Sequence, residues 1–190
     1  MADESDLKYD GNQLLFADHA TDFGASPTTA ANSILVGTQT DVQIDLTGVA
    51  ASGGARQSAK TASLGDPRVS MYRVDGCVEF ETAPTDGGSV DFYWANCPNS
   101  TAATGNPAGL TGSDAAFTDT SGNLGQLTYV GSLVCRNNVI NIGSIGFLRP
   151  EHQYGILVVV NNADQALRST ATAMDETHIT FTPLAYVPGA

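Results

Sequence analysis

Positive charge is scarce in this sequence. Eight of the 190 residues are lysine or arginine, against 20 aspartates and glutamates, so the formal net charge is −12. Eight cations cannot form the basic stripe that a nucleic-acid-binding surface needs, and an anionic membrane surface is disfavoured for the same reason. We therefore expect no nucleic acid and no membrane among the partners. A soluble acidic protein, or one that docks onto a more basic partner, fits this balance.

Cysteine is also scarce. The three residues, Cys77, Cys97 and Cys135, are odd in number and match no zinc-binding spacing. We expect them to be small buried side chains in a protein made in a reducing cytosol, although a Cys77–Cys97 bridge stays open if their strands pair. The first six residues, Met-Ala-Asp-Glu-Ser-Asp, are acidic and precede no apolar run of signal-peptide or membrane-spanning length, so we expect neither segment.

Patterns that carry catalysis are missing from the sequence. There is no Gly-x-Ser-x-Gly turn, no Walker-type phosphate loop and no pair of histidines at ligand spacing. Glu79 and Glu81 would share one strand face, which suggests the paired carboxylates of glycoside hydrolysis, but a solvated strand face is the better interpretation. We therefore predict that the protein is not an enzyme and holds neither a cofactor nor a metal.

What the sequence does contain is strand-like alternation, interrupted by 20 glycines. The clearest pattern surrounds Asp86-Gly87, where residues 77–83 and 90–94 alternate and predict a β-hairpin. A second turn is predicted at Asp75-Gly76. The predicted strands cover residues 33–36, 42–46, 69–74, 77–83, 90–94, 126–134, 139–147, 154–160 and 177–185. This pattern predicts an all-β protein, an antiparallel, jelly-roll-like β-sandwich.

The predicted organisation is an N-terminal arm over residues 1–30 and one sandwich domain over residues 31–190. Long polar loops are expected at 47–67 and 95–125, and the second is of a length that is usually functional or mobile. Ile156 to Val160 is apolar on both faces, which predicts a central, fully covered strand. The predicted core contains Ile44, Val78, Phe80, Phe92, Trp94, Leu133, Ile142, Ile156, Val158 and Phe181.

The C-terminal quarter carries a resemblance to a known family. The strand and turn "YGILVVVNNADQAL" at 154–167 and the last strand "ITFTPLAYV" at 179–187 resemble the β-sandwich decoration, or cement, proteins of tailed bacteriophages. The similarity is strongest over residues 77–187 and weaker over 33–76. It implies a jelly-roll-like fold, a dimer or trimer on the exterior of the virion capsid, the major capsid protein as partner, and no catalytic residues.

Two sets of candidate site residues follow. Five apolar residues of the arm are candidates for contact with a partner, namely Leu7, Tyr9, Leu14, Leu15 and Phe16. The alternative is that Leu14 to Phe16 form the first strand of the chain's own sandwich. Tyr93, which faces away from Trp94, and Tyr129 are candidates for an exposed ligand face beside the 95–125 loop. They support the alternative function, a lectin-like carbohydrate-binding module or a head-fibre or tail adhesion module.

Overall fold

The structure is a computed structural model that describes residues 6–9, 11–21, 23, 34–64, 69–119, 122–169 and 176–187. Within these residues it contains β-strands and two short 3-10 helices, and no α-helix. The prediction of an all-β protein is therefore confirmed. A helix long and apolar enough to cross a membrane does not occur in the described part of the chain.

Eleven strands form one sheet. Their bounds are β1 Asp6–Tyr9, β2 Gln13–Ala17, β3 Gln39–Gln43, β4 Gly54–Gln57, β5 Met71–Glu79, β6 Ser89–Cys97, β7 Ala115–Phe117, β8 Thr128–Val134, β9 Ile140–Leu148, β10 Tyr154–Asn161 and β11 His178–Val187. The 3-10 helices η2, Pro107–Gly109, and η3, Asn123–Gln126, lie between β6 and β8.

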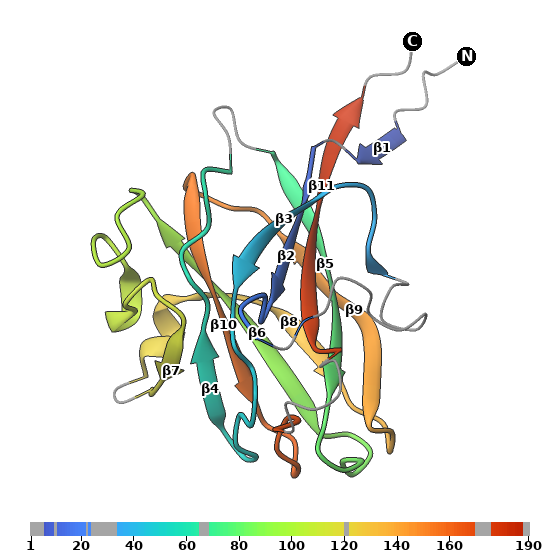
Figure 1. The fold of residues 1–190 in the computed structure, drawn as a ribbon. Coiled ribbons are helices and arrows are strands. Elements are labelled where there is room, and N and C mark those ends of the chain that lie inside the picture. The colour runs from blue at the N-terminus through green and yellow to red at the C-terminus, as the bar shows by residue number, and fades with distance from the viewer. Residues whose placement is uncertain are drawn as a thin grey trace.

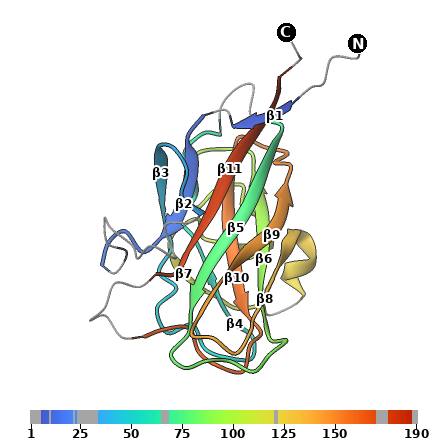
Figure 2. The same ribbon diagram turned by 90° about the vertical axis from the view of Figure 1, so that its right-hand side faces the viewer.

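The strand order is β3-β2-β11-β5-β9-β8-β6-β10-β4-β7, with β1 paired to the end of β11 (Figure 1). The sheet curls, so that β2 and β11 lie across from β6 and β10 (Figures 1 and 2). A hydrogen bond from Ala59 N to Gln43 O, 2.9 Å long, joins the end of β3 to the chain that follows β4. The β3 end of the sheet therefore meets the chain next to β4, near the other end, and the curled sheet encloses the main core.

The main core lies between the facing halves of this sheet. Phe16 of β2 and Phe181 of β11 contact Trp94 of β6 across it, with ring centroids 6.4 and 5.3 Å apart. All three side chains are fully buried. Edge-to-face and tilted contacts of this kind add to the hydrophobic gain of burying large rings. These three rings form the aromatic centre of the main core.

A second apolar cluster, the outer cluster, lies on the opposite face of the sheet. Ile156 and Val158 of β10 point into it, whereas Leu157 and Val159 point into the main core. Residues of the 98–127 connection, including Leu110 and Phe117, cover it. The predicted full cover of 156–160 is confirmed, and the long connection is packed onto the sheet.

The outer face of β11 is covered as well. His178, Thr180 and Thr182 alternate along this face and are 0–1% exposed. The ring of Phe23 lies 5.2 Å from that of His178, and Ile34 packs against the neighbouring Cys77 of β5. The described part of the connection between β2 and β3 thus lies over this region.

Several strand predictions were wrong. The predicted turn at Asp75-Gly76 lies inside the continuous strand β5, and residues 34–36 form no strand. The predicted hairpin does not form, because β9 and β8 lie between β5 and β6 in the sheet. The connecting residues pair elsewhere: Glu81 N donates to Ala166 O, and Gly87 N donates to Cys135 O.

Two further differences concern the sheet itself. β4 lies inside the segment 47–67, which was predicted to be a loop. The strand was not predicted because its sequence, Gly-Ala-Arg-Gln, has no apolar alternation. The sheet is mixed, not purely antiparallel, because β2 and β3 run parallel. The connection between them, residues 18–38, is long enough for the crossover that parallel strands require.

The predicted core is confirmed except at one position. Nine of its ten residues are at most 5% exposed, whereas Ile142 is 37% exposed. The three cysteines are buried thiols, as expected, and Cys77 and Cys97 form no bridge in the structure. Burial raises the pKa of the Cys97 thiol, and burial together with Asp164 raises that of Cys135 to about 11, so both stay protonated near neutral pH.

Candidate functional site

Among the described strands, the outer face of β8 and β9 carries the exposed large apolar and aromatic side chains. Its exposed large side chains are Tyr129 (54%), Val134 (63%), Ile142 (37%) and Phe147 (59%). Elsewhere in the described chain the outer faces of β10 and β11 are covered. We call the outward residues of β8 and β9 the open face; they are Tyr129, Ser132, Val134, Ile142, Ser144 and Phe147.

The shape of the open face follows from the strand sequences. Ser132 and Ser144 are small, so the centre of the face is low. Gly131 pairs with Gly146 in the antiparallel β8–β9 ladder. This register puts Tyr129 and Phe147 toward one end, the aromatic end. It puts Val134 and Ile142 toward the other, the aliphatic end.

The structure brings the two predicted tyrosines together beside the aromatic end. Tyr93 of β6 is the pairing partner of Tyr129 on β8, and their ring centroids are 5.3 Å apart with an interplanar angle of 59°. Tyr93 is half-buried and packs against the outer cluster, as do Leu124 and Leu127 of the 98–127 connection. Tyr129 is exposed and Tyr93 is half-buried, and a role of either side chain in binding a ligand stays a prediction.

Polar side chains that the sequence did not single out complete this site. The hydroxyls of Tyr129 and Ser132 are hydrogen-bonded to each other. Ser132 Oγ donates to Asp91 Oδ1 at 2.5 Å, and Asn162 Nδ2 donates to Asp91 Oδ2 at 2.7 Å. We call these four residues together with Tyr93 the tyrosine site. Asp91 lies two residues before Tyr93 on the same strand, so the sequence could have placed it on the same face. The contacts of Ser132 and Asn162 with Asp91 depend on strand register, which the sequence does not show.

The environment of Tyr93 keeps its hydroxyl protonated. Burial raises the pKa of Tyr93, and the nearby Asp91, Tyr129 and Asp119 raise it further. A neutral phenol can both donate and accept a hydrogen bond. The tyrosine site thus offers rings, hydroxyls and one carboxylate at a half-exposed position.

The candidate contact residues of the arm lie in a different place. Leu14, Leu15 and Phe16 belong to β2, between β3 and β11, and are 0–8% exposed. They form a strand of the chain's own sheet, the alternative that the sequence left open. Leu7 and Tyr9 lie in β1, whose backbone pairs with the end of β11, and their contact with a partner stays a prediction. The predicted domain boundary near residue 30 lies outside the described residues.

Ion pairs hold several charged side chains of the described residues. Glu79, predicted on a solvated face, is 3% exposed and bound by Arg168. Arg56 bridges Asp45 and Asp114, at 3.1 and 3.0 Å. Such pairs join separate segments of the chain. Among the described residues, no group of three or more His, Cys, Asp or Glu side chains could hold a metal ion.

Lys60 holds the start of the long connection in place. Its Nζ donates to three backbone carbonyls, those of Asn99 (3.3 Å), Thr101 (2.7 Å) and Thr104 (3.0 Å). These three carbonyl groups belong to no strand, and the loop around them has little regular structure. The charge-assisted bonds from Lys60 therefore fix this loop.

We expect Lys60→Met to loosen this loop while the apolar stem stays packed. The loss of the ammonium group should lower the free energy of unfolding by about 1–3 kcal/mol. Hydrogen exchange should become faster at residues 99–106 before any other segment. Arg136→Met, at an exposed turn, is the control. Unchanged exchange in the loop of the Lys60 variant would show that Lys60 does not hold it.

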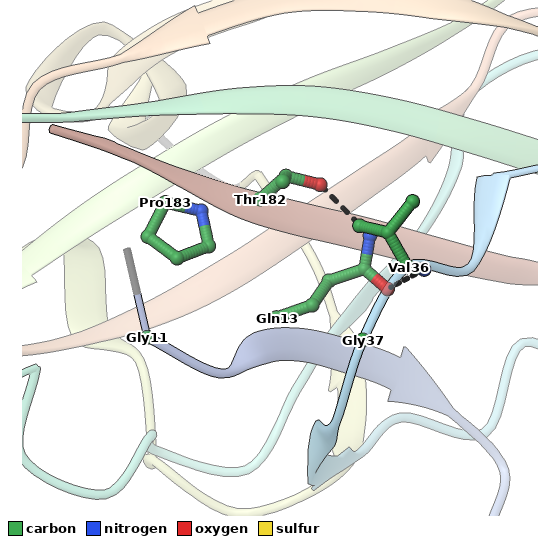
Figure 3. Close-up of a pocket in the computed structure, with 6 residues that line it drawn as sticks. All are labelled: Gly11, Gln13, Val36, Gly37, Thr182 and Pro183. Atoms are coloured by element: carbon green, nitrogen blue, oxygen red, sulfur yellow. Dashed lines mark hydrogen bonds between the residues drawn. The ribbon is translucent and has the colours of Figure 1, made fainter. Parts of the chain in front are cut away.

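A small cavity near the N-terminal strands is a weak candidate. It has a volume of about 130 Å³ and is lined by Gly11, Gln13, Val36, Gly37, Thr182 and Pro183 (Figure 3). The amide of Gln13 is used internally, because Nε2 donates to Thr182 Oγ1 at 2.8 Å and Oε1 accepts from Val36 N at 3.1 Å. The main polar group of the cavity is thus engaged in holding β2, β11 and residue 36 together.

Comparison with known proteins identifies no relative of this chain. No protein-family model, curated protein or solved structure matches the chain. The open face and the tyrosine site therefore carry the functional argument.

Proposed function

We propose that this protein is a structural virion protein that binds the outer surface of a bacteriophage capsid and stabilises it, as decoration or cement proteins do. The proposal starts from the resemblance of residues 77–187 to that family. The observation that carries it is the open face, an accessible apolar surface on two neighbouring strands. The finer description of the curled sheet as a jelly-roll-like sandwich belongs to the same proposal.

The aliphatic end of the open face is suited to docking on another protein. Val134 and Ile142 expose apolar surface that a monomer gains nothing by leaving in water. The small side chains of Ser132 and Ser144 between the two ends let a partner approach the strands closely. These are the properties of a patch that becomes the dry centre of an interface.

Arginines border the open face. Arg136 lies in the turn between β8 and β9, Arg149 directly follows β9, and Arg73 is the β5 pairing partner of Phe147. In a chain with eight cations and a net charge of −12, three of them flank this one surface. Arginine is enriched at protein interfaces, where a charged rim steers association. The complementary surface has an apolar centre and an acidic rim.

In this proposal the major capsid protein supplies that surface, and the protein resides on the capsid exterior. Assembly as a dimer or trimer is part of the same proposal. Binding requires no chemistry beyond surface complementarity, which agrees with the prediction of a protein that is not an enzyme.

The test is sedimentation with purified capsids of the phage whose genome encodes this chain. We expect Val134→Lys and Ile142→Lys each to weaken binding by roughly 30-fold, since burying an unpaired ammonium group at the centre of an interface costs about 2 kcal/mol or more. Ala116→Lys adds the same charge at an exposed position of β7 and should bind as the unchanged protein does.

The two possible failures are distinct. Full binding by both lysine variants would remove the open face as the docking surface and leave capsid binding itself intact. Absence of binding by the unchanged, folded protein would contradict the decoration function.

A further inference from the structure

We propose that the tyrosine site binds a neutral saccharide, with one sugar ring lying against Tyr129 and its hydroxyl groups bonded to Asp91. This site goes beyond the proposed capsid function. It shares Tyr129 and Ser132 with the open face, whereas the capsid argument uses Val134 and Ile142 at the aliphatic end. It comprises Tyr93, Tyr129, Asp91, Ser132 and Asn162, from β6, β8 and the turn after β10.

The aromatic platform is already in place. The ring of Tyr129 is 54% exposed, so its face is accessible, yet its position is fixed at two points. Tyr93 packs against the ring with a centroid distance of 5.3 Å, and Ser132 holds the hydroxyl. A ring fixed in its bound orientation costs little entropy on binding, which is what a weak, stacking ligand such as a sugar needs.

The carboxylate beside the platform has capacity to spare. Asp91 accepts one hydrogen bond on each oxygen, from Ser132 and from Asn162. An ionised carboxylate has about four lone-pair sites, so each oxygen can accept one further bond. Adjacent hydroxyls of a sugar ring are donors at a spacing that two carboxylate oxygens can accept together, and O–H···O⁻ bonds are stronger than neutral ones.

The charge of the site selects against other ligands. Asp91 and Asp119 both act on Tyr93, and the whole chain carries −12, so a phosphate or a sulfate would be repelled. A purely apolar ligand would cover Asp91 without giving it donors, which costs free energy. A neutral saccharide satisfies both conditions, because it has an apolar ring face and many hydroxyl donors.

The test begins with an array of neutral and sialylated glycans, followed by calorimetry with the neutral oligosaccharide that gives the strongest signal. We expect Tyr129→Ala and Asp91→Ala to weaken binding at least roughly tenfold, a loss of one stacking or one double hydrogen-bond contact. Tyr129→Phe keeps the ring and should stay within roughly threefold of the unchanged protein. Ile142→Lys, which lies at the aliphatic end, should bind the glycan normally.

Three results would overturn the site: no neutral glycan bound on the array, binding restricted to sialylated glycans, or equal affinity for the Tyr129→Ala variant. Tyr129 is exposed, so its truncation should leave folding intact and keep the test decisive. The Asp91→Ala protein should still sediment with capsids, because Asp91 of β6 lies outside the open face, so a failure of the saccharide site and a failure of capsid docking give different results.

Discussion

A Gly155→Ala variant should lose about 3 kcal/mol or more of stability, since a single methyl group at this position meets the aromatic centre of the main core. A Cβ atom at Gly155 would lie 1.9 Å from Trp94 Cζ2 and 2.3 Å from its Cε2. Trp94 cannot move aside, because it is fully buried against Phe16 and Phe181. In a chain of this length the melting temperature should fall by roughly 6–12 °C, measured by calorimetry.

The matched control is Gly143→Ala, on another strand of the same sheet. There the added Cβ would meet only the Cδ1 tip of Leu133, at 3.1 Å, and this tip can shift. We expect a loss of at most about 1 kcal/mol. A second comparison uses Trp94→Phe, which removes ring atoms near Gly155. The two changes together should cost less than the sum of their separate losses, and strict additivity would contradict the clash.

The strands with strong local patterns could be predicted from the sequence. β8, β9, β10 and β11 lie within two residues of their predicted bounds, because each combines alternation or an apolar run with a polar turn beside it. β4 and β7 have no such pattern and take their structure from pairing with β10 and with each other. Strand order could not be predicted, because it depends on pairings between residues far apart in sequence.

Ile142 illustrates where alternation misleads. In a strict alternation along β9, Ile140, Ile142 and Leu148 would share one face, and Ile145 would lie on the other. The β5–β9 ladder shifts register between Val74 and Asp75, so the face that points inward changes along β9. Ile145 and Leu148 then enter the main core, and Ile142 faces outward. An irregularity in the partner strand cannot be read from the β9 sequence alone.

The candidate site was predictable to a similar degree. Alternation with Trp94 indicated that Tyr93 faces outward, and this holds. Its contact with Tyr129 depends on β6 and β8 being neighbours, and the bond from Asn162 to Asp91 depends on the turn that follows β10. The residues that give the site its chemistry are therefore drawn together by tertiary pairing, not by a sequence motif.

An Arg168→Met variant should lose about 3–5 kcal/mol in the free energy of unfolding, measured with urea at neutral pH. The Glu79 side chain is 4% exposed, and its Oε1 accepts from Arg168 Nη1. Its Oε2 accepts from the backbone N–H of Glu176 at 3.2 Å. Methionine keeps most of the apolar stem of arginine but leaves the carboxylate buried beside no cation, which is the costly arrangement.

This ion pair also joins three segments that meet at the end of β5. Arg168 N donates to Glu79 O at 3.0 Å, and Glu79 N donates to Thr177 Oγ1 at 3.0 Å. The chain after β10 and the chain before β11 are thus both fastened to one residue. Loss of the guanidinium group should therefore speed hydrogen exchange near residues 166–169 and 176–178 more than in β6 or β10.

The double variant Glu79→Gln with Arg168→Met separates charge from packing. A neutral amide at position 79 can still accept a hydrogen bond from Glu176 N and needs no counter-charge. The double variant should therefore recover at least half of the stability that Arg168→Met loses. Arg149→Met, at an exposed position, is the control and should stay within about 0.5 kcal/mol of the unchanged protein. If the double variant is as unstable as Arg168→Met alone, the buried charge is not the cause, and the lost contacts of the arginine side chain carry the effect instead.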